Sequence, residues 1–385
     1  MTLIQAVVEA TGFSTANIPT YDRTASPSTS YLTGLRGILV LESVFWIFFQ
    51  TFIPALVTDD AHGPTYQHVL RIVLSVPFWN ESLIISFFII LSARTICVPF
   101  LQNPCAATYA RSLIRRPLRM AISLSIASGL AILILSQLGT AYIDEFKSTL
   151  PNDSVSTPAT AQSAIVAFNS IFDLFWIVTD FSEQAANAFW PSATLWCPSL
   201  IYYQGYTVYM LMVILPFTRA RWHPQALALF ALGSFWLESW GWYSVAGLLL
   251  ADFSTDGSIK AGFGHGFKIA GDIRFAPSMS ATVLIVAGLA IKYAWAAVPQ
   301  YSNAELILHP TFHLSTGTTV KNFDKANPYP RVDDFLVIVG VLLFVEMSDS
   351  AKSLLSTRPL LWLGERSLSE LNVLAVPQVI ASDTI

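Results

Sequence analysis

Long apolar runs separated by polar segments are the main pattern of this chain. A helix needs about 20 consecutive apolar residues to cross a hydrocarbon core of about 30 Å, and residues 31–57 (YLTGLRGILVLESVFWIFFQTFIPALV) supply the first such run. Similar runs recur, so the pattern predicts an all-α fold, a polytopic transmembrane helical bundle with about 8 to 9 spanning helices. We expect spans at 34–57, 81–101, 117–138, 196–218, 224–240, 242–253, 279–298 and 334–350.

The polar segments divide the chain into a leader, residues 1–30, and one transmembrane domain, residues 31–385. Within the polar connection 140–195, bulky apolar residues recur at helical spacing from Ala164 to Val178 (AIVAFNSIFDLFWIV). Such a helix either lies in the membrane interface or packs onto the protein core, and both interpretations stay open.

Composition agrees with a membrane protein, because 54% of the residues are hydrophobic and only 12% are charged. A formal net charge of −4 without any long basic run excludes nucleic-acid binding. The three cysteines, Cys97, Cys105 and Cys197, lack the spacing of metal ligands, so we predict no metal site and no disulfide framework. The leader has no apolar core followed by a cleavage site, which argues against a removable signal peptide.

The distribution of basic residues predicts the orientation in the bilayer. Most of the 21 Lys and Arg residues fall on the side of the predicted bundle that also holds the amino terminus. Loops rich in these residues stay in the cytoplasm, so we expect a cytoplasmic amino terminus. Glycosylation sequons begin at Asn80 (NES) and Asn152 (NDS), on the opposite side, which is compatible with a glycoprotein.

Several ionisable residues fall inside the predicted spans, where an unpaired charge costs several kcal/mol. We therefore expect Arg94, Glu238, Lys292 and Glu346 to form pairs that hold helices together. Glu42 lies in the middle of the first span, at a depth where charges are usually paired or functional.

Four segments together resemble the acyltransferase-3 family of integral membrane acyltransferases. They are LTGLRGILVL (Leu32 to Leu41), SFFIILSA (Ser86 to Ala93), YARSLIRRPLRMA (Tyr109 to Ala121) and RPLLWLGERSLS (Arg358 to Ser369). A looser match, TLWCPSLIYYQGYTVYMLMVILP from Thr194 to Pro216, is similar to the middle helix of the family. The order and spacing of these segments carry the resemblance.

The resemblance implies an acyltransferase-3-like fold and transfer of an acyl group, often acetyl, from acyl coenzyme A to a hydroxyl on a small molecule, lipid or glycan. Acyl coenzyme A would be a co-substrate, with no permanently bound cofactor. Ser92 would help to stabilise the oxyanion. The donor phosphates would bind to arginines, whose guanidinium groups suit phosphate oxygens: Arg36, Arg111, Arg115, Arg116 and Arg119. The same arginines could instead set topology or contact acidic lipid.

Two positions depart from the family pattern. The family supplies a histidine as general base eleven residues after the first arginine, and this chain has Ile47 there. Glu42 is the nearest ionisable candidate, although it points to a different helix face from that position. Leu368 and Leu371 stand where relatives often have tyrosine, and the chain ends soon afterwards, so we expect a truncated carboxyl-terminal end.

Two further functions stay open. A catalytically inactive scaffold or regulator on the same fold would explain Ile47 and the short end. An ion-coupled transporter would use the intramembrane acids Glu42, Glu238 and Glu346 as an ion path.

Overall fold

A computed structural model describes most of the chain. The described residues are 29–58, 63–102, 105–139, 141, 144–145, 158–159, 163–176, 184–188, 195–218, 222–255, 267–270, 273–275, 277–302, 305 and 328–373. Within these ranges nearly every element is a helix, and the sole sheet is an antiparallel pair, β1 (Phe267–Ala270) with β2 (Ile273–Phe275).

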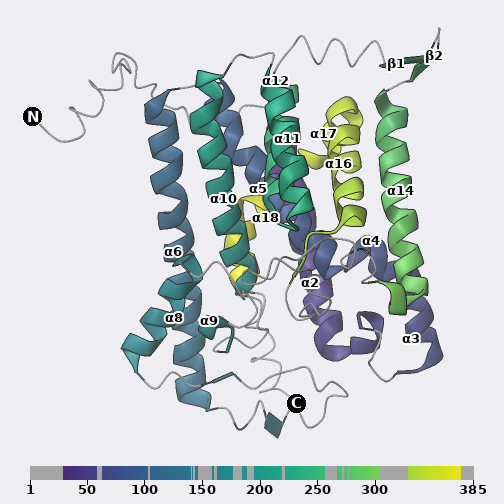
Figure 1. Ribbon diagram of the computed structural model, residues 1–385. Helices are drawn as coiled ribbons and strands as arrows, with labels where there is room; N and C mark the ends of the chain where they lie inside the picture. The colour runs from purple at the N-terminus through teal and green to yellow at the C-terminus, as the bar shows by residue number, and fades with distance from the viewer. Residues whose placement is uncertain are drawn as a thin grey trace, which may run out of the picture.

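The longer helices stand side by side, as α6, α10, α12 and α14 show in Figure 1. The α-helices are α2 (Ser30–Phe52), α3 (Thr65–Leu70), α4 (Val76–Phe78), α5 (Glu81–Gln102), α6 (Ala106–Leu138), α8 (Ala164–Trp176), α9 (Ala185–Ala188), α10 (Trp196–Ile214), α11 (His223–Trp236), α12 (Gly241–Thr255), α14 (Pro277–Ala297), α16 (Val332–Met347), α17 (Asp349–Leu355) and α18 (Arg358–Val373). Short turns of other helix types are η1 (Pro54–Leu56), η2 (Arg71–Ser75), η4 (Leu215–Phe217) and η6 (Pro299–Tyr301).

Each apolar run found in the sequence coincides with a helix, so the predicted helical architecture is confirmed. Among the described residues, four helices are long and apolar enough to cross a membrane: Ser30–Phe52, Thr65–Gln102, Ala106–Leu133 and Ser278–Ala297. The chain is therefore a membrane protein by length and composition of its helices. The larger span count stays a prediction, because α11, α12 and α16 have only 14, 15 and 16 residues against about 20 for a full crossing.

Helix α5 forms the centre of the bundle. It packs against α2, α10, α12 and α16, and Ile90 and Leu91 in its middle are 0% exposed. Such burial on all sides explains why its sequence shows an unbroken apolar run rather than an amphipathic pattern. Side chains near the carboxyl-terminal end of α5, which we predict to face the cytoplasm, are therefore held in fixed positions.

The amphipathic stretch in the polar connection is helix α8, as its spacing predicts. Leu174 is buried where α8 packs against α10 and α6, and Phe168, Phe172 and Trp176 are exposed on another face. One face of α8 therefore packs onto the core, and a place in the membrane interface for its exposed face stays a prediction.

Glycines bring α18 into direct backbone contact with α2. A Cβ atom added at Gly364 of α18 would overlap the carbonyl oxygen of Thr33, and one added at Gly37 of α2 would overlap that of Leu360 on α18. The helices pack this closely because neither glycine has a side chain. The carboxyl-terminal segment therefore lies against the first helix.

Replacing Gly364 with alanine is expected to separate α18 from α2 and to cost about 1–3 kcal/mol of stability through overpacking. Thermal unfolding in detergent measures the effect. Gly129→Ala is the matched control, because a Cβ atom at Gly129 meets nothing within 4 Å. An unchanged melting temperature for Gly364→Ala would contradict the close contact.

Three of the four charges predicted to pair, Arg94, Lys292 and Glu346, form ion pairs, whereas the pairing predicted for Glu238 stays a prediction. Arg94 of α5 donates to the carboxylate of Glu346 on α16, and Lys352 lies 3.6 Å from the same carboxylate. Lys292 of α14 lies 2.5 Å from Asp334, which is 0% exposed. These pairs tie α5, α14 and α16 together within the apolar bundle.

Asn80, which begins the first sequon, is part of the fold. Its side-chain oxygen accepts from the backbone N–H of Leu83, 3.0 Å away, and from Lys292, 3.3 Å away. Ser82 donates to Asp334. Asn80 therefore caps α5 beside the Lys292 pair. These contacts use the side-chain oxygen, whereas a glycan attaches to the side-chain nitrogen, so glycosylation at Asn80 stays a prediction. The sequon at Asn152 lies outside the described residues.

Candidate functional site

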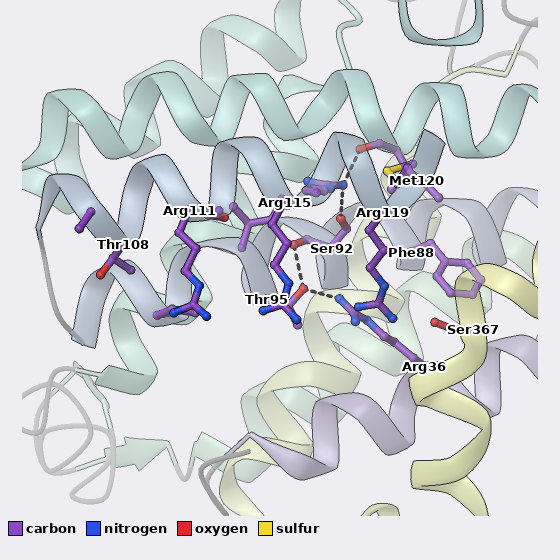
Figure 2. A pocket seen from close by; sticks show the side chains of 16 residues that line it. Arg36, Phe88, Ser92, Thr95, Thr108, Arg111, Arg115, Arg119, Met120 and Ser367 are labelled. Atoms are coloured by element: carbon purple, nitrogen blue, oxygen red, sulfur yellow. Dashed lines mark hydrogen bonds between the residues drawn. The ribbon is translucent and has the colours of Figure 1, made fainter. Parts of the chain in front are cut away.

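A cavity of about 540 Å³ lies between α2, α5, α6, α10 and α18. Figure 2 shows its lining side chains, which come from segments far apart in the sequence. They are Arg36, Phe88, Ser92, Thr95, Ile96, Pro99, Ala107, Thr108, Arg111, Ser112, Arg115, Arg116, Arg119, Met120, Ile201 and Ser367. Each of the five arginines that the sequence nominates for donor binding, and Ser92, is in this set.

Arg111, Arg115 and Arg119 form a row along α6, which we call the arginine row. Their spacing of four residues puts them on one helix face. The helical rise separates the first from the last by about 12 Å along the axis. All three are exposed, and Figure 2 shows their guanidinium groups on the same side of α6 as that of Arg36. The row therefore presents several donors to one ligand.

Arg36 and Arg116 are half-buried and hold the side chains of α5. Arg36 donates to the hydroxyl of Thr95, and Thr95 in turn donates to the carbonyl of Ser92 at 3.0 Å. Arg116 donates through Nη2 to the Ser92 hydroxyl at 2.7 Å and to the carbonyl of Ile201 at 3.0 Å. Arg116 of α6 thus links Ser92 of α5 to Ile201 of α10 through hydrogen bonds from its charged guanidinium group.

Helix α18 closes the cavity at one side. Arg119 donates to the backbone carbonyl of Glu365, 3.2 Å away, and Ser367 lines the cavity. The contact of Gly364 with α2 fixes this wall. The segment RPLLWLGERSLS, near the end of the chain, is therefore part of the same site as the first helix.

The arginines run along the cavity, and its Phe88 and Met120 end adds apolar side chains beside Arg36 and Arg119. Among the described residues that line the cavity, five are arginines and none is acidic. Phe88 and Met120, which are 7% and 4% exposed, lie at the opposite end of the site from Thr108 in Figure 2. The arrangement suits an elongated ligand with phosphate groups on one part and an apolar group on another.

Glu42 is not among the lining residues, and the structure does not bring it to Ser92 or the arginines. Ile47 is 6% exposed and packs in the apolar core. Histidine is likewise absent from the described part of the lining. A catalytic role for Glu42 stays a prediction without geometric support from this cavity.

Sequence reasoning missed Thr95, Phe88, Met120 and Ser367. Three of these four lie inside the segments quoted above, so the resemblance could have found them. Thr95 lies just beyond SFFIILSA, and its role depends on Arg36 reaching across from α2, which no local pattern reveals.

Cys105 lies at the Thr108 end of the cavity, outside the candidate spans. Its sulfur caps α6 by accepting from the backbone N–H of Thr108, 3.4 Å away, and it also contacts the Thr108 hydroxyl. The hydrogen bond from the Thr108 side chain lowers the pKa of the Cys105 thiol. Cys97 and Cys197 are buried, so Cys105 is the most accessible thiol of the three.

No group of three or more His, Cys, Asp or Glu side chains among the described residues is arranged to hold a metal ion. Comparison with models of known protein families, with curated proteins and with solved structures found no match for this chain.

Proposed function

We propose that this chain is an acyltransferase-3-like membrane enzyme that binds acyl coenzyme A in the arginine-lined cavity and transfers the acyl group to an acceptor hydroxyl. One observation carries the proposal. The four segments that resemble the family lie on α2, α5, α6 and α18, more than 300 residues apart at the extremes, and all four contribute to one cavity. Side chains chosen by sequence alone therefore meet in space.

The charge of the cavity matches the donor. Coenzyme A carries a diphosphate and a ribose phosphate, together about four negative charges, and guanidinium forks bind such oxygens through paired hydrogen bonds. The arginine row supplies three exposed guanidinium groups along about 12 Å of helix, a spacing that suits phosphate groups spread along a ligand. The apolar side chains of Phe88 and Met120 would receive the acyl group.

The transfer balances without a permanently bound cofactor. The acceptor oxygen attacks the thioester carbonyl, the new C–O bond forms, the C–S bond breaks, and the departing thiolate needs one proton. The acceptor hydroxyl releases one proton. The proton that the acceptor releases balances the one that the departing thiolate takes up. None of the described lining residues is a carboxylate or an imidazole.

The arginines of the cavity would face the cytoplasm, where acyl coenzyme A is made available and where loops rich in arginine stay. The amino terminus would lie on the same side, and the remaining apolar helices would complete a multi-pass bundle around the site. The acceptor would be a small molecule, a lipid or a glycan that carries a free hydroxyl.

Alkylation of Cys105 tests whether acyl coenzyme A occupies this cavity. A maleimide is expected to label Cys105 ahead of Cys97 and Cys197 in folded protein, because its thiol is accessible and its lowered pKa raises the thiolate fraction at neutral pH. Saturating acyl coenzyme A, which has no free thiol, is expected to slow this labelling at least tenfold.

Cys105→Ser is the control that assigns the label, and formation of a labelled ester with an added hydroxyl acceptor tests transfer itself. Unchanged labelling at a saturating acyl coenzyme A concentration would place the donor elsewhere. Loss of ester formation in Arg36→Ala but not in Arg358→Gln, an exposed arginine outside the cavity, would support the proposal.

A second function is favoured by the chemistry of the lining. The absence of an acid or imidazole among the described lining residues, with Ile47 buried in the core, suits a catalytically inactive scaffold that binds acyl coenzyme A and does not turn it over. Such a protein would show Cys105 protection by acyl coenzyme A and no ester product with any hydroxyl acceptor. The two measurements therefore separate the two functions.

A further inference from the structure

Arg116 differs from the arginine row in its surroundings. The row is exposed along one face of α6, whereas Arg116 is half-buried and turned toward α5 and α10. One residue step along a helix changes direction by about 100°, which explains why Arg115 and Arg116 point to different sides. The two neighbours therefore contact different groups.

A socket on α10 holds the guanidinium of Arg116. Its Nη2 donates to the carbonyl of Ile201, and one turn later Gly205 lies directly against the same group. A Cβ atom added at Gly205 would overlap Nη1 and would lie 3.1 Å from Cζ and 3.5 Å from Nη2. Gly205 is thus the residue that leaves room for this arginine.

Ser92 has an unusual hydrogen-bonding role for a helical serine. Hydroxyls inside helices often donate to the carbonyl one turn earlier, as Ser43 does to Leu39 at 2.7 Å and Thr51 does to Ile47 at 2.9 Å. The Ser92 hydroxyl oxygen instead accepts from Arg116 at 2.7 Å. Its own proton is then directed away from Arg116, at a position on the cavity wall.

We propose that Arg116 is a positioning residue that orients the Ser92 hydroxyl to donate its proton to the thioester carbonyl oxygen, while the arginine row binds the donor phosphates. The proposal rests on the function proposed above and assigns different roles to the arginines of the cavity. Ser92 supplies the hydrogen bond that strengthens as the carbonyl oxygen gains negative charge. Arg116 fixes that donor and does not itself contact the phosphates.

The contacts of Arg116 support this division. Its Nη2 is used by Ser92 and Ile201, and its Nη1 lies buried against Gly205. A phosphate could reach it only by displacing these partners. Arg115, one position earlier, is exposed on the cavity side and suits phosphate binding.

Gly205→Ala tests the proposal because it displaces Arg116 and keeps every charge of the cavity. We expect kcat for acyl transfer to fall about 100-fold, the usual effect of losing one oxyanion donor, with the Kd for acyl coenzyme A changed less than about threefold. Arg115→Gln should do the opposite, raising Kd and leaving kcat nearly unchanged. A merely structural role would not produce this split.

Ser92→Ala provides a second variant that keeps α10 intact. It should lower kcat as much as Gly205→Ala, and the double variant should be no worse than either single one, because both remove the same interaction. Gly129→Ala, with open space around its Cβ atom, is the control for a helix glycine and should behave as wild type.

The outcomes separate a failure of the positioning role of Arg116 from a failure of the proposed acyltransferase function. An active wild type in which Gly205→Ala and Ser92→Ala leave kcat unchanged, or in which they act on Kd alone, overturns the role of Arg116 and keeps the acyltransferase. A wild type that neither binds nor transfers from acyl coenzyme A overturns the proposed function and this inference together. Additive losses in the double variant also overturn the positioning role.

Discussion

Replacing Arg111, Arg115 and Arg119 together with glutamine is expected to weaken acyl coenzyme A binding by about 100-fold. A hydrogen bond to a charged group is worth about 1.5–3 kcal/mol, and exposure lowers this to about 1 kcal/mol for each side chain of the row. Three such losses give about 3 kcal/mol, which is about two orders of magnitude in Kd. Glutamine keeps much of the side-chain length, so the change removes mainly charge. Equilibrium binding of labelled acyl coenzyme A in detergent measures it.

Salt and ligand controls separate phosphate binding from loss of fold. Binding to the wild type should weaken as ionic strength rises, and the triple variant should show a smaller salt dependence because the responsible charges are gone. Arg358→Gln should bind as wild type, since Arg358 lies outside the cavity. A triple variant with unchanged Kd and unchanged salt dependence would show that the row serves membrane topology or acidic lipid instead.

Lys292→Met is expected to lower the free energy of unfolding by about 3–5 kcal/mol. The substitution leaves Asp334, which is 0% exposed, without the ammonium group 2.5 Å away. Asp333 keeps Arg331, 3.2 Å away, so the cost falls mainly on Asp334. Reversible unfolding in mixed detergent micelles, followed by tryptophan fluorescence, measures the change.

The double variant Lys292→Met with Asp334→Asn should recover a large part of this loss. Asparagine removes the uncompensated charge, and its side-chain oxygen can still accept from Ser82. If Lys292→Met costs less than about 1 kcal/mol, the pair does not hold α14 to α16 as described. If the double variant is no more stable than Lys292→Met, the cost comes from lost packing of the lysine stem.

Sequence patterns predicted the helices well and the site in part. The apolar runs placed every long helix, because burial in a bilayer or a bundle core imposes an unbroken apolar requirement that is visible locally. The arginine row was also visible, since its spacing of four residues fixes a common helix face before any tertiary contact is known. Arg36 lines the same cavity as the row.

Features that depend on distant contacts could not be seen. The link from Arg36 to Thr95 and the socket at Gly205 each require two helices to pack in one particular register. The contacts of Asn80 with Lys292 and of Ser82 with Asp334 join residues more than 200 positions apart, so the sequon alone does not reveal them. A structural pair was predicted for both Arg94 and Glu346, but that they pair with each other, and that Lys352 joins them, depends on the packing of α5 against α16.

Photocrosslinking with acyl coenzyme A that carries a photoreactive group on its acyl chain shows directly whether the donor binds in this cavity. We expect the label to attach to peptides of α5 and α6 that contain Phe88 or Met120, unlabelled acyl coenzyme A to compete, and the triple arginine variant to lose the label. Labelling confined to other helices, or labelling that unlabelled acyl coenzyme A does not reduce, would show that the donor does not bind there.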